Sequence, residues 1–233
     1  MPRLARSADD VTRAALLDIF NRLLYHYGPR QWWPAETPFE VCVGAILTQN
    51  TNWGNVEKAI SALKQADVLT PEGMRAVDPD LLANMIRPSG YFNVKSRRLK
   101  DFLAWLFAGH NGSLERMFAN DWRVLRGELL AVRGIGPETC DSILLYAGGK
   151  PTFVVDTYTR RLFHRLGLLS ERADYDKTRS LFMANLPEDV ALYNEYHALI
   201  VEQCKQFCRT KPSCADCPLA GCCLHHADSI QRH

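Results

Sequence analysis

The sequence lacks several features that would each decide its class at once. It has no uninterrupted apolar stretch near the ~20 residues that span a bilayer, although hydrophobic residues make up 47% of the chain. It has no internal repeat and no low-complexity tract. Its first residues, Met-Pro-Arg-Leu-Ala-Arg, form no apolar leader. These absences argue against membrane, repeat and disordered proteins, and we expect an intracellular protein.

A large excess of charge is also missing. The formal net charge of +2 is too small to indicate a nucleic-acid partner by itself, so any such partner would need local basic patches. Two basic clusters are present, and each taken alone is best explained as a solvated helix face. They are Lys95, Arg97, Arg98 and Lys100, and Arg160, Arg161 and Arg165. With 233 residues the chain can bury its own core, as one large domain or two small ones.

Alternating β-branched segments are absent too, and apolar residues instead recur at helical spacing. Glycine and proline punctuate these stretches. We therefore expect an all-α protein of two helical lobes, with the cysteine-rich end closing one of them. The predicted helices span residues 9–27, 39–47, 56–65, 79–86, 95–107, 122–132, 138–147, 156–166, 174–184 and 190–202.

Cysteines are concentrated near the end of the chain. One Cys-x-x-Cys pair there has a further cysteine on each side, so four thiolates can surround one centre. Such a set suits zinc or an iron–sulfur cluster, and a single pair inside a short loop favours [4Fe–4S]. The predicted ligands are Cys208, Cys214, Cys217 and Cys223.

Three alternatives stay open for the cysteines. Cys222 is adjacent to Cys223 and either could be the last ligand. The four thiols could also be buried and free, whereas disulfides do not suit an intracellular chain. Cys42, Cys140 and Cys204 are interpreted as packing residues or a spare thiol.

A second informative stretch is the turn Gly134-Ile135-Gly136, followed by Pro137 at the start of a predicted helix. Glycines and a helix N-terminus favour a phosphate group, although an isolated Gly-x-Gly is more often a plain helix hairpin. Twenty residues after Gly136, Asp156 follows three apolar residues at another predicted helix start. By itself Asp156 would be an N-cap carboxylate.

Together these features resemble the helix-hairpin-helix DNA glycosylase superfamily, in the branch of endonuclease III. The Leu-x-Gly-Ile-Gly hairpin, the Val-Val-Asp-Thr segment and the cysteine loop occur in the family's order, and the resemblance covers residues 39–223. Residues 45–51 are similar to the segment that wedges into the duplex, and residues 86–99 resemble the family's Gly-x-x-x-x-Lys segment. The first cysteine interval is one residue shorter than in endonuclease III.

The resemblance implies a DNA-binding cleft, bent double-stranded DNA, a flipped-out nucleotide and hydrolysis of its N-glycosidic bond. It places Asp156 on the catalytic aspartate and the four predicted cysteines on the [4Fe–4S] ligands. The DNA-binding residues it implies are Gln49, Asn50, Arg133, Gly134, Ile135, Gly136 and Glu138, with Gln49 or Asn50 filling the gap left by the flipped nucleotide.

The same resemblance implies a cytoplasmic monomer associated with the nucleoid, and it divides the chain into four parts. Residues 1–27 are expected to form a helix that packs with the cluster lobe, and residues 28–132 a six-helix lobe. Residues 133–155 hold the hairpin and a linker. Residues 156–233 complete the cluster lobe, with the cluster loop at 208–223.

One departure from the family concerns the chemistry. Bifunctional members have a lysine just after the hairpin that forms a Schiff base with the sugar, and here Glu138 stands in that place. A carboxylate cannot form an imine, so the resemblance implies a monofunctional glycosylase without lyase activity. A bifunctional enzyme acting on oxidised pyrimidines through another lysine, and a non-catalytic binder of damaged DNA, are the alternatives.

Tryptophans suggest the substrate. Trp32 and Trp33 precede Pro34, and Trp53 follows the predicted wedge, a pairing that most resembles 3-methyladenine DNA glycosylases. A methylated purine is flat and positively charged, and indole faces attract both properties. We therefore predict a base pocket at Trp32, Trp33 and Trp53 for alkylated purines, with core packing as the alternative role of each indole.

Overall fold

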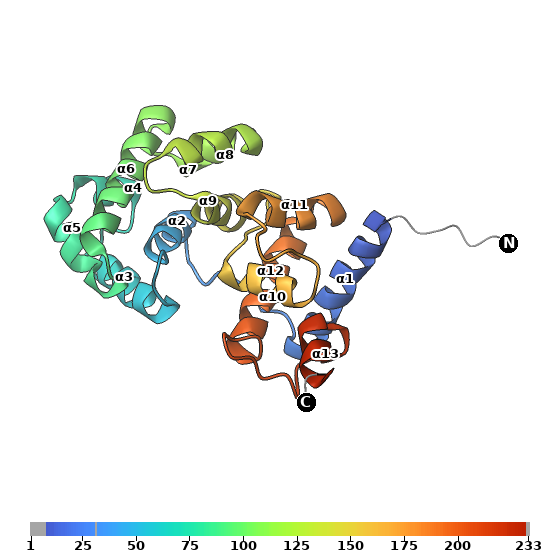
Figure 1. Cartoon of the computed structure of the whole chain (residues 1–233). Helices are drawn as coiled ribbons and strands as arrows, with labels where there is room; N and C mark the ends of the chain where they lie inside the picture. Colours follow the sequence, from blue (N-terminus) through green and yellow to red (C-terminus); the bar gives the residue numbers. More distant parts are fainter. Residues whose placement is uncertain (1–7, 31, 232–233) are drawn as a thin grey trace. The chain divides into compact units, whose positions relative to one another are not determined.

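A computed structural model of the chain describes residues 8–30 and 32–231. These residues form helices joined by turns and contain no strand (Figure 1), which confirms the expected all-α class. Residues 1–7, which carry the prediction about a leader, and Gln31 lie outside the described residues. No helix in the described part of the chain is long and apolar enough to cross a membrane.

The chain divides into two compact units. The central unit is the continuous segment Trp33–Lys150, and the terminal unit contains the described residues of Met1–Trp32 and Pro151–His233. The terminal unit is therefore built from both ends of the chain.

The central unit is a cluster of short helices, and six of them begin at a side-chain cap: Thr37, Asn52, Thr70, Asp78, Ser113 and Asp121. Its elements are α2 (Pro38–Leu47), α3 (Trp53–Gln65), α4 (Pro71–Ala76), α5 (Pro79–Met85), η1 (Arg87–Ser89), α6 (Phe92–His110), α7 (Leu114–Phe118), α8 (Trp122–Ala131), α9 (Pro137–Ser142) and the π-helical turn η2 (Ile143–Ala147).

Helix α2 lies at the centre of this unit. Its residues from Phe39 to Leu47 are all buried, because the helix packs against α3, α6, α9 and η2. A helix that is apolar on every side is stable only when other helices surround it. Helix α2 thus forms the centre of the core of this unit.

The terminal unit contains α1 (Ala8–Tyr27), α10 (Thr157–Arg165), α11 (Tyr175–Asn185), α12 (Val190–Gln206), η3 (Ala220–Cys222) and α13 (Leu224–Gln231). Helix α1 packs on α11 and α12, which come from the other end of the chain (Figure 1). Its core is aromatic, with Phe153 stacked on Phe182 at 3.8 Å between ring centroids and Tyr196 edge-on to both.

The structure differs from the predicted helices in two ways. It contains three short helices that apolar spacing did not indicate, α4, α7 and α13. It also divides the predicted helix 138–147 into α9 and the π-helical turn η2, where Gly148 donates its N–H to the carbonyl of Ile143. Such turns widen a helix locally and are frequent at functional sites.

The basic clusters are not solvated helix faces, and that interpretation is wrong for four of their members. Lys95 is 1% exposed and donates to the carbonyls of Leu47 and Ser89 at 2.8 and 2.6 Å. Lys100 binds the carbonyls at the end of α4, and Arg161 and Arg165 bind backbone carbonyls of residues 208–210. Each cation satisfies carbonyls that a helix end or a loop leaves unpaired, a local role that charge counting does not reveal.

Candidate functional site

A tight turn joins α8 to α9 in the central unit. Gly134 has a φ of +88°, and a Cβ there would lie 2.4 Å from Cγ of Arg98, so only glycine fits. Gly136 is the N-cap of α9 and is exposed, as are Arg133 and Glu138. The side chain of Ile135 is 4% exposed and belongs to the core, which leaves its backbone as the part that could meet a ligand.

Gln49 holds this turn in place. Its amide nitrogen donates to the carbonyl of Gly134 at 3.0 Å and to the hydroxyl of Thr139 at 2.9 Å, and its amide oxygen accepts from the guanidinium of Arg98. Gln49 is therefore engaged inside the protein, whereas the neighbouring Asn50 is exposed. Of the two predicted wedge residues, Asn50 is the one whose side chain is available.

Tyr91 is a second strained position, like Asn50. Both have left-handed backbones, with φ of 55° at Asn50 and 46° at Tyr91, and Tyr91 is 70% exposed. The buried ammonium of Lys95 binds the carbonyls of Leu47 and Ser89, which shortly precede the two turns. A single cation thus fixes both turns, and strained non-glycine residues of this kind cluster at functional sites.

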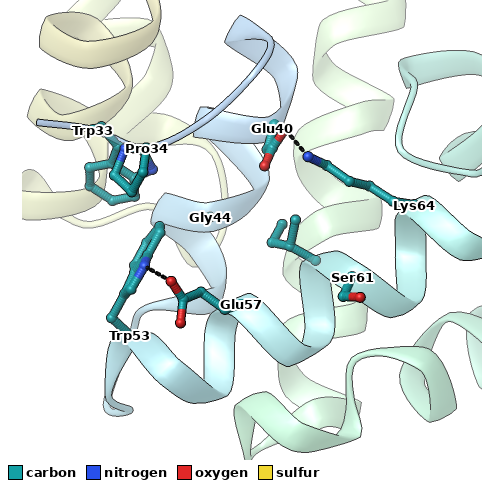
Figure 2. A pocket seen from close by; sticks show the side chains of 9 residues that line it. Trp33, Pro34, Glu40, Gly44, Trp53, Glu57, Ser61 and Lys64 are labelled. Atoms are coloured by element: carbon teal, nitrogen blue, oxygen red, sulfur yellow. Dashed lines mark hydrogen bonds and ion pairs between the residues drawn. The ribbon is translucent and has the colours of Figure 1, made fainter.

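A pocket of about 190 Å³ lies between α2, α3 and the segment that precedes α2 (Figure 2). Two of the predicted pocket residues, Trp33 and Trp53, line it, and their rings meet edge to face at 5.1 Å between centroids. Trp32 belongs to the terminal unit, where the ammonium of Lys205 lies 5.7 Å from its ring centroid. The structure therefore brings Trp33 and Trp53 together in one unit.

The carboxylates at the pocket have different partners. Lys64 binds both Glu36 and Glu40, at 2.8 and 3.0 Å. Glu57 accepts a hydrogen bond from the indole N–H of Trp53 at 2.8 Å (Figure 2). The pocket thus combines indole rings with carboxylates.

Asp156 is the N-cap of α10 in the terminal unit. Its Oδ1 accepts from the backbone N–H and the hydroxyl of Thr159, at 2.7 and 2.8 Å, and its Oδ2 lies 3.6 Å from Nε2 of His197. Burial raises the pKa of the Asp156 carboxyl, but His197 and the bonds from Thr159 outweigh it, so this pKa lies below its usual range. The side chain is 13% exposed and ionised at neutral pH.

The four predicted cluster cysteines line one pocket of the terminal unit, together with apolar side chains that include Leu162 of α10, Leu166 and Phe207. Cys222 does not line it; it is exposed and donates to the carbonyl of Leu219. The pocket-lining cysteines are Cys208, Cys214, Cys217 and Cys223.

Polar groups approach two of these sulfurs. Gln203 donates to Sγ of Cys217 at 3.0 Å, and Arg165 donates to Sγ of Cys208 at 3.3 Å. A hydrogen bond from Cys204, aided by Arg165 and opposed by burial, lowers the pKa of the Cys208 thiol. Within the described residues, no group of three or more Cys, His, Asp or Glu side chains is arranged to hold a metal ion. The thiols surround a space instead of meeting at one point.

Comparison with known proteins decides the family. Residues 43–188 match the family described as HhH-GPD superfamily base excision DNA repair protein. The chain belongs to this superfamily. A protein of Methanocaldococcus jannaschii whose name assigns it provisionally to the DNA repair glycosylases is 50% identical over 208 residues, 88% of this chain and 94% of that protein.

Two solved structures are similar to this glycosylase. The H. pylori 3-methyladenine DNA glycosylase MagIII, bound to 1,N6-ethenoadenine, has 31% identity and a TM-score of 0.73, over 84% of this chain and 97% of that one. Endonuclease III in a covalent complex with DNA has 22% identity and a TM-score of 0.81, over 94% and 98% of the two chains. These matches confirm the resemblance to the endonuclease III branch. They also confirm two predictions, that the chain is a helix-hairpin-helix DNA repair glycosylase and that it binds DNA.

Sequence reasoning missed several residues of this glycosylase. Tyr91 lies within residues 86–99, whose resemblance to a family segment did not single it out, and its exposure and positive φ emerge from the structure alone. His197 gave no signal, because an isolated histidine in a predicted helix has no partner that the sequence can identify. The role of Arg98, which packs over Gly134, was hidden within a basic cluster.

Proposed function

We propose that this glycosylase is monofunctional and removes cationic alkylated purines, with 3-methyladenine as the type substrate. The observation that carries the proposal is the environment of Asp156, an ionised carboxylate at a helix start, combined with Glu138 in the place of the family's Schiff-base lysine. The 31% identity to a 3-methyladenine DNA glycosylase supports the substrate.

Asp156 is assigned two roles in the reaction, electrostatic stabilisation and general-base catalysis. As the N-glycosidic bond breaks, its electron pair leaves with the base and positive charge develops at C1′ of the sugar. The carboxylate stabilises that charge, and it accepts a proton from the water whose oxygen bonds to C1′. A cationic base departs as a neutral molecule, so its N-glycosidic bond is weak. One carboxylate then suffices to catalyse the cleavage of that bond. The products are a free base and an intact abasic strand.

The base pocket is assigned to Trp33 and Trp53, which line the pocket of the central unit. Indole faces attract a flat cation, and a flipped base needs such stacking to replace its neighbours in the duplex. The edge-to-face contact of Trp33 and Trp53 supports this role, because it holds both rings rigid.

The grip on DNA is assigned to the turns of the central unit. The backbone of residues 134–136, with Arg133 and the start of α9 at Glu138, contacts phosphate without reading sequence. Asn50 and Tyr91 are the side chains proposed to enter the duplex at the lesion, since both are exposed on strained turns that Lys95 anchors.

The cysteine pocket is assigned to a [4Fe–4S] cluster held by Cys208, Cys214, Cys217 and Cys223. The residues fit this group, because thiolates spaced around an apolar pocket suit a cluster in which each cysteine binds its own iron. Hydrogen bonds to the sulfurs from Gln203 and Arg165 also suit bound thiolates. The cluster would order a loop that has few apolar residues of its own.

Incubation with methylated DNA, followed by chromatography of the released bases, tests the proposed substrate. We expect 3-methyladenine to be released and the DNA strand to remain intact until alkali is added. Borohydride should trap no protein on the DNA, since trapping requires an imine. Nicking of thymine-glycol DNA without alkali, with methylated purines left in place, would establish the bifunctional alternative.

A further inference from the structure

We infer that Glu57 is a specificity-determining residue, which makes the pocket at Trp33 and Trp53 prefer a cationic base to a neutral base of similar shape. The inference rests on the proposed function, because it takes this pocket as the one that receives the flipped base. It adds a residue and a physical property, charge selection, to a pocket whose aromatic walls alone attract any flat ring.

The aromatic side of the pocket is held in place by contacts between rings. Trp33 meets Trp53 at an interplanar angle of 88° and lies 5.1 Å from Tyr146, so its ring is held between two others. Gly44 of α2 lies under the same ring, where a Cβ would already be 3.4 Å from it. Such walls provide stacking and dispersion, which depend little on the charge of the ligand.

The charges of the lining are not balanced. The lining residues include two carboxylates, Glu40 and Glu57, and one ammonium, that of Lys64. Lys64 is occupied by Glu40 (Figure 2) and also binds Glu36, which lies outside the lining. Glu57 lies one turn away from Ser61 on α3 and, within the described residues, forms no ion pair. Its charge is therefore available to a ligand.

A carboxylate in this place requires a reason, because DNA is a polyanion and phosphate repels it. A cationic ligand in the pocket reverses the sign of that interaction. The bond from the Trp53 indole to Oε1 of Glu57 also keeps the carboxylate beside the ring and leaves Oε2 to a ligand. Glu57 thus combines with the indole faces, which attract the same cations.

The competing explanation is that Glu57 only orients Trp53. The variant Glu57→Gln separates the two roles, because the amide oxygen still accepts the indole hydrogen bond but carries no charge. We would measure single-turnover excision from duplexes that hold either 7-methylguanine, which is cationic, or 1,N6-ethenoadenine, which is neutral. Charge selection predicts that the ratio of the two rates falls by roughly tenfold in the variant.

Glu72→Gln is the matched control, since it removes one exposed carboxylate from α4 of the same unit and leaves the pocket intact. Its rate ratio should equal that of the wild type. An equal slowing of both lesions by Glu57→Gln would overturn the inference, because it would show a purely structural role. An unchanged ratio would overturn it too.

Direct binding distinguishes failure of this inference from failure of the proposed function. If the wild type excises neither lesion, quenching of tryptophan fluorescence by 7-methylguanosine and by guanosine decides the matter. Selective binding of the cationic nucleoside, weakened roughly tenfold by Glu57→Gln, would support charge selection without excision. Equal binding of both nucleosides would overturn it.

Discussion

At the scale of single residues, Asp156 serves two purposes with two oxygens. Oδ1 caps α10 through Thr159, and Oδ2 lies toward His197. The sequence alone predicted the cap, and only the resemblance to a family predicted a catalytic role. The cap keeps the carboxylate in one position and helps to keep it ionised.

Replacing Asp156 by Asn should separate these two purposes. Asparagine caps helices as well as aspartate does, so the fold and DNA binding should persist. Base excision should fall by about 100-fold or more, because the negative charge that faces the developing cation is lost. The measurement is single-turnover release of the base, beside a binding titration.

The control for this prediction is Asp174→Asn. Asp174 caps α11 of the same unit by accepting from Lys177 at 2.8 Å, so it has the same local geometry without the proposed chemistry. Excision by this variant should match the wild type. A similar loss in both variants would assign the effect to capping.

Lys95 should make stability depend on pH. Burial, with the nearby charge of Arg98, lowers the pKa of Lys95 to about 8 from its ordinary 10.5. Between these two values the unfolded chain holds a proton that the folded chain has released, so the free energy of unfolding rises with pH. The gain across this window is at most roughly 3 kcal/mol.

Urea denaturation of wild type and Lys95→Met at several pH values checks this. Other groups titrate in both proteins, so the difference between the two curves isolates Lys95. That difference should change in favour of the wild type between pH 8 and 10.5. Parallel curves would show that Lys95 is not the group concerned.

These residue-scale features differ in how far the sequence predicts them. Asp156, the tryptophans and the cysteines stand in recognisable motifs, so their types and spacing indicate chemistry. Lys95 and Arg98 occur in a basic cluster, and only the fold shows that one is buried under two helix ends and the other packs over Gly134. Partners distant in the sequence decide such roles.

At the scale of elements, the turn between α8 and α9 should tolerate no side chain at Gly134. The φ of +88° and the contact with Arg98 both oppose a Cβ. Gly134→Ala should lower the free energy of unfolding by about 1–3 kcal/mol and weaken binding to all duplexes alike. Chemical denaturation and binding to several DNA sequences would measure the two effects.

Gly127→Ala, in the helix that precedes the turn, is expected to have the opposite effect on stability. Gly127 lies inside α8, and a Cβ there meets nothing within 4 Å. Alanine should stabilise the protein by about 0.5–1 kcal/mol, since glycine is a poor helix former. If both variants destabilise the protein equally, the turn is not the special position that its geometry indicates.

The cysteine pocket makes an element-scale prediction about metal. Cys217→Ser should abolish bound iron and the visible absorption of the purified protein, because it removes one thiolate from the pocket. Cys222→Ser should retain both, because Cys222 lies outside the pocket. Iron analysis after anaerobic purification checks this, and stoichiometric zinc in a colourless protein would contradict the cluster.

Helix prediction located most helix starts, although α3 and α6 begin three residues earlier than predicted. Helices α1, α2, α8 and α12 begin within a residue of their predicted starts. The helices that were missed have between five and eight residues, too few for an apolar period to repeat. The π-helical turn was missed because the residues of η2 have an ordinary helical pattern, and only the bond from Gly148 reveals the wider turn.

At the scale of the whole molecule, the sequence predicted two helical lobes, and the structure has two compact units, with the chain passing from one to the other after Trp32 and after Lys150. What local patterns could not show is that α1 packs on α11 and α12, which come from the far end of the chain. The hydroxyl of Tyr196 donates to the carbonyl of Leu16 at 2.8 Å across 180 residues. Contacts of that separation follow from the fold alone.

The packing of α1 on helices from the other end of the chain determines when this helix can fold during synthesis. Leu16, Ile19 and Leu23 are buried against the terminal unit, and Tyr27 reaches the cysteine pocket through Gln203, which bonds to Cys217. At about 5–20 residues per second of synthesis, the apolar face of α1 is made many seconds before its partners. Meanwhile the central unit emerges as one uninterrupted segment. Among the described helices of the terminal unit, α1 thus waits longest for its partners, and its apolar face stays uncovered by them during that time.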